Sequence, residues 1–172
     1  RVRLLANDQV EIDYRPGDYR DLPVFIRGNP ARPGPVVPRR FPEALSAGAP
    51  RPFKEGSGRR ELADAIVTDA AGLTARVFVN RTWGCVFGRP LVATPSNFGA
   101  LGTRPTHPEL LDDLAARFVA KGWSVKWLVR ELVLSAAYRQ SSRHDPAGAA
   151  ADPDDRLLWR APRKRLEVEA WR

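Results

Sequence analysis

The side chains best suited to chemistry are a few polar residues set into an apolar stretch, residues 73 to 111. Arg76 and Asn80 lie four residues apart in a segment that is otherwise typical of an apolar helix, so both project from the same helix face. Polar groups on a buried helix need partners. Two interpretations follow: either they bind carbonyl groups of the Gly- and Pro-rich loop 89–105, which we favour, or they face a ligand.

The candidate site extends from this pair to other residues that are poor choices for a purely apolar core. Guanidinium groups and an indole close to a helix N-terminus could hold a carboxylate, a sulfate or a sugar. One member, His107, falls in the first turn of a predicted helix, where an imidazole could act as acid, base or ligand, although a surface or capping role is more common there. The candidate ligand-binding residues are Arg76, Asn80, Arg81, Trp83, Thr106, His107, Tyr138 and Arg139.

No established catalytic or metal-binding motif accompanies these residues. The sequence lacks GxSxG, a Walker A loop, and GxGxxG after a strand. It contains two histidines, His107 and His144, without an HExxH pattern, and a single cysteine, Cys85. One cysteine excludes an internal disulfide and a cysteine-based zinc cluster, and the CxxCH pattern for covalent haem is absent. We therefore assign no catalytic residue, metal or cofactor to this segment.

The chain is strongly basic, with 172 residues, a formal net charge of +8 and a pI near 10.5. Such a charge brings nucleic acid, anionic glycan or a membrane surface into consideration as partners. The basic residues are mostly Arg and are spread along the chain, so we expect only weak, electrostatic nucleic-acid binding. No stretch of about 20 apolar residues is present, and we expect no membrane span. The absence of any Met favours a segment of a longer protein.

Helical periodicity dominates residues 59–172, which we interpret as a helical bundle-like domain. We expect Ser57 to cap the first helix, Thr106 and Glu109 to form a capping box, and Ser124 to cap the fourth helix. Gly88 and Gly122 are placed to end helices. The predicted helices span residues 59–68, 73–87, 107–121 and 125–138, and a last helix opens at residue 163, with Arg165 and Glu169 four residues apart. The first helix is expected to carry Leu62, Ala65 and Ile66 on one apolar face, and the fourth to turn Val125, Leu128, Val129, Leu132 and Ala136 inward. Residues 141–155 are expected to form a polar loop.

Residues 1–58 are predicted to form a small β element followed by a proline-rich arm. Alternating apolar residues indicate a hairpin within the first 21 residues and a third strand at residues 22–27. The stretch 32–53 is too rich in proline for a helix or a central strand. A disordered linker is one interpretation; we favour an arm docked through Val37 and Phe41. The fold class is therefore mainly α, with domains at 1–58 and 59–172.

Several motifs in order resemble a known family. NRTWGCVFGRPLV, TPSNFGALG, PTHPELLDDLAARFVAKGWSVKWLVRELVLSAAYRQSS and DPDDRLLWRAPRKRLEVEAWR are similar to the planctomycete family called domain of unknown function 1553, over about residues 22 to 172. The resemblance implies a large exported polypeptide that also carries cytochrome-c-like haem domains, hence an extracytoplasmic location, haem outside this segment, and other domains of the same polypeptide as partners. The sequence departs from the family at residues 84–86, Gly-Cys-Val, where relatives commonly have polar residues, often including His.

These observations favour an uncharacterised structural or ligand-binding module of an exported multidomain protein, with an anionic glycan or small anion as ligand. An enzyme or enzyme subunit acting on polysaccharide or another anionic substrate is the first alternative. Nucleic-acid binding is the second. The departure at residues 84–86 weighs against catalysis, because residues that were catalytic in relatives would be missing here.

Overall fold

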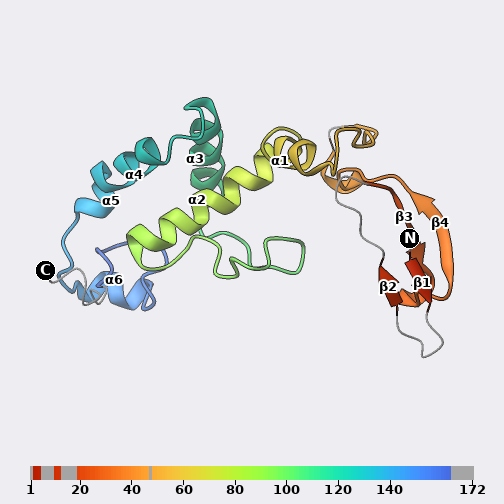
Figure 1. The fold of residues 1–172 in the computed structure, drawn as a ribbon. Coiled ribbons are helices and arrows are strands. Elements are labelled where there is room, and N and C mark those ends of the chain that lie inside the picture. Colours follow the sequence, from red (N-terminus) through yellow and green to blue (C-terminus); the bar gives the residue numbers. More distant parts are fainter. Residues whose placement is uncertain (1, 5–9, 13–18, 47, 164–172) are drawn as a thin grey trace, which may run out of the picture. The chain divides into compact units, whose positions relative to one another are not determined.

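The computed structural model describes residues 2–4, 10–12, 19–46 and 48–163. Its contacts divide the chain into two compact units, Arg1–Ala70 and Ala71–Arg172, each of which we describe by itself (Figure 1). Six α-helices and two small two-stranded sheets in the described part confirm the mainly α fold class. The predicted last helix, with its Arg165–Glu169 pair, lies outside the described residues. No helix in the described ranges is long and apolar enough to cross a membrane.

The first unit contains two antiparallel strand pairs. β1 (Val2–Leu4) pairs with β2 (Val10–Ile12), which confirms the predicted hairpin. β3 (Leu22–Phe25) pairs with β4 (Pro33–Val37), so the beginning of the proline-rich arm is a strand. Proline is tolerated in β4 because each strand of a two-stranded sheet has an unpaired edge. A 3-10 turn, Ile26–Gly28, joins β3 and β4.

The remainder of the arm folds back onto a helix. Phe41 is 5% exposed and forms a small core with Ala65 and Ala70, against which Phe53 packs. The predicted burial of Phe41 is therefore confirmed. The predicted burial of Val37 is wrong, because this last residue of β4 is 37% exposed. A second 3-10 turn, Glu43–Leu45, follows Phe41 in the chain.

α1 (Arg59–Val67) begins differently from the prediction. Its N-cap is Gly58, and no side chain caps it, so the assignment of Ser57 is wrong. Gly58 has φ of 77°, and a Cβ there would lie 2.9 Å from the Cβ of Phe53, so this position requires glycine for both conformation and space. On the predicted apolar face only Ala65 is buried; Leu62 and Ile66 are exposed.

The second unit holds five helices and most of the core. The order along the chain is α2 (Ala71–Phe87), α3 (Pro108–Ala120), α4 (Val125–Leu134), α5 (Ala136–Arg139) and α6 (Pro146–Ala151). Gly88 follows α2 with φ of 84° and Gly122 follows α3 with φ of 65°, as predicted for helix C-termini. The glycines therefore set where both long helices end.

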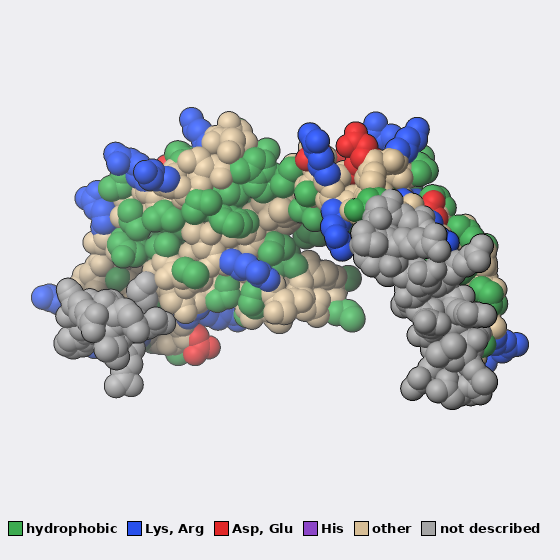
Figure 2. Space-filling view, in the orientation of Figure 1, with side chains coloured by type: hydrophobic (Ala, Val, Ile, Leu, Met, Phe, Trp, Pro, Cys, Tyr) green, Lys and Arg blue, Asp and Glu red, His purple; other side chains and the backbone are tan. Residues whose placement is uncertain are grey.

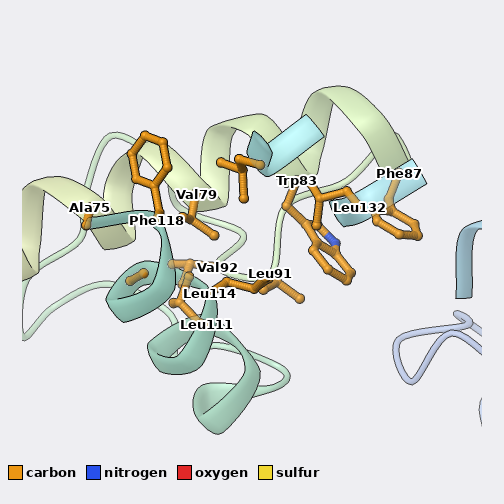
Figure 3. Packing of buried hydrophobic residues seen from close by; sticks show 12 residues of the cluster. Ala75, Val79, Trp83, Phe87, Leu91, Val92, Leu111, Leu114, Phe118 and Leu132 are labelled. Carbon is orange, nitrogen blue, oxygen red and sulfur yellow. The ribbon is translucent and has the colours of Figure 1, made fainter. Parts of the chain in front are cut away.

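α2 and α3 pack against each other around one apolar core, which α4 completes (Figure 3). Leu91 and Val92, from the loop that follows α2, lie between the two helices. The prediction that Val125 and Val129 face inward is wrong, because both are exposed, Val125 by 47%, and the predicted inward Ala136 is exposed as well. The buried residues of α4 are Leu128 and Leu132, and the partly buried Trp127 packs against the same core. The core residues are Ala75, Val79, Trp83, Phe87, Leu91, Val92, Leu111, Leu114, Ala115, Phe118, Leu128 and Leu132.

Two serines cap the N-termini of α4 and α5. The Ser124 hydroxyl accepts a hydrogen bond from the Trp127 amide at 3.3 Å, which confirms the predicted cap. The predicted continuous helix to Tyr138 is wrong, because Ser135 takes an extended ψ of 151° and separates the two helices. Its hydroxyl accepts a hydrogen bond from the Tyr138 amide at 3.2 Å, so Ser135 caps a new helix where the prediction had an interior position.

α6 occupies part of a segment predicted as a polar loop. Asp145 caps it by accepting a hydrogen bond from the Gly148 amide at 2.9 Å. A Cβ at Gly148 would lie 2.6 Å from the ring of Trp159, so the indole packs directly on the helix backbone. An isolated six-residue helix is marginal in water. The tertiary contact with Trp159 accounts for the presence of α6, and the local sequence pattern does not predict that contact.

Candidate functional site

Asn80 ties α2 to the loop that follows it. Its side chain is fully buried; the amide Nδ2 donates to the Val92 carbonyl at 3.2 Å, and the Val92 amide donates to Oδ1 at 2.8 Å. The carboxamide thus bonds both the N–H and the C=O of Val92, as a residue of a neighbouring antiparallel strand would. The favoured interpretation predicts both observations: Asn80 bonds the loop and is closed to solvent.

Arg76, one turn earlier on α2, has a different partner from the one predicted. Its Nε donates to Oδ1 of Asp112 on α3 at 2.6 Å, and Nη1 donates to the Gly72 carbonyl at 3.4 Å. The predicted contact with carbonyls of the 89–105 loop is therefore wrong. The hydrogen bond from Arg76 lowers the pKa of the Asp112 carboxyl. The side chains are partly exposed, so this ion pair joins α2 and α3 at the surface.

The predicted capping box of Thr106 and Glu109 is wrong, because the helix begins one residue later and no side chain caps it. The N-cap of α3 is His107, without a side-chain cap, and Pro108 opens the helix. Thr106 closes the loop instead: its amide donates to the Leu91 carbonyl at 3.0 Å. The His107 Nδ1 lies 3.0 Å from the Thr106 hydroxyl. The imidazole therefore contacts its chain neighbour, and His107 occupies the N-cap position without capping the helix through its side chain.

Of the other four candidates, Trp83 is buried and the remaining three are exposed. Arg81 lies on the outer side of α2, and Tyr138 and Arg139 lie on α5. The Tyr138 ring meets Phe87 edge-on, with ring centroids 5.8 Å apart. The structure does not gather the eight predicted residues into one site. Two of them, Trp83 and Thr106, line the same cavity.

That cavity, which we call the Trp83 pocket, has a volume of about 300 Å³ and lies in the second unit. Three segments far apart in the sequence enclose it: the end of α2, the loop between α2 and α3, and a segment after α6. This volume is at the lower end of the range for small-molecule sites. The lining residues are Trp83, Arg89, Pro90, Leu91, Ala93, Thr103, Arg104, Thr106, Arg156 and Leu158.

The pocket combines an apolar wall with basic groups. Trp83 stacks on Phe87 with ring centroids 4.1 Å apart, which fixes the plane of the indole, and Leu91 is buried beside it. Arg104 and Arg156 are exposed, and neither forms a salt bridge within the described part of the chain. Arg156 is still close enough to Asp152 to contribute, after the Leu157 amide, to the lowered pKa of that carboxyl, so its charge is not isolated. Two guanidinium groups outside any salt bridge, beside an apolar wall, suit a ligand with an anionic head and an apolar body.

Sequence reasoning missed three of the arginines that line this pocket: Arg89, Arg104 and Arg156. Each stands in a segment without helical periodicity, and no fixed spacing relates them, because the tertiary fold alone brings the segments together. The available signal was the Gly- and Pro-rich loop itself, since irregular loops held by a rigid scaffold often carry binding residues. Among the described residues, no three His, Cys, Asp or Glu side chains cluster as they would around a metal ion.

The fold and site define a mainly helical unit whose long loop is clamped by a buried asparagine and walls an apolar, arginine-lined pocket. Residues 58–172 match the family model PSD1, described as "Protein of unknown function (DUF1553)", and the chain belongs to that family. The family part of the predicted resemblance is therefore confirmed. The chain matches no curated protein and no solved structure.

Proposed function

We propose that the second unit is a binding module for a small anionic ligand with an apolar body, and that the Trp83 pocket is its site. The arrangement of Arg104 and Arg156 carries this proposal, because both guanidinium groups line one concave apolar surface and lack salt-bridge partners in the described residues. A carboxylate or sulfate head would satisfy these donors, and a ring or short alkyl body would bury apolar area against Ala93 and Leu158, beside the Trp83 indole, which is itself only 4% exposed.

The distribution of charge supports a localised site over a long polyanion track. On the face of the molecule shown in Figure 2, lysine and arginine side chains are scattered and do not form one continuous stripe. A protein that follows a nucleic-acid backbone or a long polyanion presents a connected basic surface. Two arginines at a small pocket instead favour one anionic group per site.

Isothermal titration with a matched set of probes tests this proposal. Naphthalene-2-sulfonate supplies both the anionic head and the apolar body, 2-naphthol supplies the body alone, and inorganic sulfate supplies the head alone. We expect saturable one-to-one binding of the sulfonate and at least about tenfold weaker binding of each partial probe. The double variant Arg104→Gln/Arg156→Gln should weaken sulfonate binding by at least about 100-fold, because charge-assisted hydrogen bonds contribute roughly 1.5–3 kcal/mol each and two of them are lost.

A matched control removes the same charge elsewhere. Lys126 and Arg130 are exposed on α4 and do not line the pocket, so Lys126→Gln/Arg130→Gln should leave the sulfonate affinity within about twofold. Equal losses in both double variants would show a general charge effect and contradict a localised site. Equal binding of 2-naphthol and the sulfonate would contradict recognition of the anionic head.

We further propose that this module belongs to a large exported planctomycete protein with cytochrome-c-like haem domains and functions outside the cytoplasm beside those domains. The motif resemblance around NRTWGCVFGRPLV supports this placement. Any haem would be bound by the other domains. Fractionation of the source cells, followed with an antibody against this unit, should place the protein in the extracytoplasmic fraction; recovery with cytoplasmic markers would contradict the proposal.

A further inference from the structure

One wall of the Trp83 pocket is a short irregular segment, residues 152–161, which we call the strap. Its hydrogen bonds are mostly internal: the Leu157 amide donates to Asp152 Oδ2 at 2.7 Å, and the Trp159 indole donates to the Asp152 carbonyl at 2.8 Å. The Leu157 amide bond lowers the pKa of the Asp152 carboxyl. Gln140 also donates to the Leu158 carbonyl at 2.9 Å, which anchors the strap near its C-terminal end.

At the centre of the strap, Asp155 forms an ion pair with Arg89, which lies outside the strap. Asp155 is 4% exposed, and its Oδ2 lies 3.2 Å from Nη2 of Arg89, the residue after the glycine that ends α2. Arg89 also donates through Nη1 to the Asp154 carbonyl. The other carboxylate oxygen, Oδ1, accepts from the Arg160 amide at 3.3 Å. The Asp155 carboxylate thus contacts both Arg89, at the end of α2, and the backbone of Arg160 within the strap.

The position of Asp155 matters because of its neighbours. Arg156 and Leu158 line the Trp83 pocket, and Arg89 lines it from the opposite segment. Asp155 and Leu158 both have positive φ, 51° and 60°, so the strap follows a backbone path that non-glycine residues rarely adopt. Such conformations persist only where surrounding contacts hold them. The Arg89–Asp155 ion pair, in which the carboxylate is buried and the arginine side chain is 36% exposed, is a contact of that kind, because a buried carboxylate without its partner is strongly unfavourable.

We infer that Asp155 is a positioning residue for the Trp83 pocket: through Arg89 it holds the strap closed and so places Arg156 and Leu158 against the ligand. The inference rests on the proposed function for its ligand, whereas the closure of the strap by the Arg89–Asp155 pair does not depend on any ligand. When the Arg89–Asp155 pair is lost, the strap opens and the pocket loses a wall. Ligand binding and strap closure are consequently linked, and a bound anion stabilises the closed strap.

The test substitutes asparagine at two adjacent positions. Asp155→Asn removes the charge but keeps a residue type that tolerates positive φ, so backbone strain is not the variable. The matched control is Asp154→Asn, whose exposed side chain has no salt bridge among the described residues and whose carbonyl contact to Arg89 is retained. Hydrogen exchange reports strap opening without any ligand, and titration with naphthalene-2-sulfonate reports the pocket.

In Asp155→Asn we expect at least tenfold faster amide exchange in peptides covering residues 155–161, unchanged exchange in α3, and at least tenfold weaker sulfonate binding. Saturating sulfonate should slow strap exchange again, an effect that a purely structural role would not produce. Asp154→Asn should match the wild type within about twofold in all measurements.

The two readouts separate the possible failures. If the wild type binds the sulfonate and Asp155→Asn binds it equally well, the inference is overturned while the proposed function stands. If the wild type binds none of the probes, the proposed function fails, and the exchange of the strap alone decides the inference. Unchanged strap exchange in Asp155→Asn overturns the inference, and faster exchange confined to the strap supports it.

Discussion

Replacing Asn80 with alanine is expected to lower the free energy of unfolding by about 3 kcal/mol. The substitution removes the partner of both the Val92 amide and the Val92 carbonyl, and both residues are buried. A buried backbone group left without a hydrogen bond costs roughly 1–3 kcal/mol, and water reaches this position poorly. Chemical denaturation monitored by far-ultraviolet circular dichroism measures the loss.

Asn97→Ala is the matched control, because it makes the same change in the same loop at an exposed residue. The Asn97 backbone carbonyl, which accepts from the Thr94 hydroxyl at 2.9 Å, is retained in that variant. We expect a change below about 0.5 kcal/mol for Asn97→Ala. A loss below about 1 kcal/mol in Asn80→Ala would contradict the assignment of Asn80 as the clamp of the loop.

Replacing Leu128 with alanine is expected to cost about 3 kcal/mol as well, within the range for truncation of a buried leucine. Leu128 is 0% exposed and is one of two α4 residues that enter the core between α2 and α3. Removing its side chain leaves a cavity that the surrounding helices fill only in part. Thermal and denaturant unfolding of the purified chain measure the effect.

Leu134, in the same helix, is 54% exposed and provides the control. Leu134→Ala removes the same atoms from a solvent-facing position, so we expect a change below about 0.5 kcal/mol. Similar losses in the two variants would mean that α4 buries a different face from the one described, with the outer valines turned inward as the sequence pattern had indicated.

The helix ends show how far the sequence determines the fold. Gly88 and Gly122 were predicted to end α2 and α3, and they do so because each takes a positive φ that most other residues resist. N-termini were harder to place. Ser124 is the N-cap, as predicted. Gly58 replaces the predicted Ser57 because the chain packs closely against Phe53 there. His107 replaces the predicted Thr106, because the Thr106 amide bonds the Leu91 carbonyl.

The candidate site was predicted only in part. Asn80 could be recognised because a polar residue on an apolar helix must find a partner, and a nearby loop supplies many carbonyls. The Trp83 pocket could not be recognised in the same way. Its basic groups come from positions 89, 104 and 156, and only the tertiary fold brings those segments together. Periodicity describes one element at a time and contains no such contact.

Gly84 illustrates a related point at the position where the sequence departs from its family resemblance. A Cβ at Gly84 would lie 3.4 Å from both the ring and the nitrogen of Pro90, which lines the pocket. A methyl group at position 84 would therefore be in ordinary van der Waals contact with Pro90, because the loop already lies close to α2 here. Here the residue type at 84 bears on the shape of the pocket wall as well as on any chemistry.

The location of ligand binding is the central claim, and nuclear magnetic resonance tests it most directly. Naphthalene-2-sulfonate should be titrated into ¹⁵N-labelled protein, with the Trp83 indole signal assigned by Trp83→Phe. We predict saturable shifts of that indole and of the amides of Ala93, Thr103 and Leu158, with the Trp123 and Trp127 indoles unchanged. Shifts centred on the exposed basic residues of α4, or a Trp83 signal that does not move at saturation, would contradict the assignment of the Trp83 pocket as the binding site.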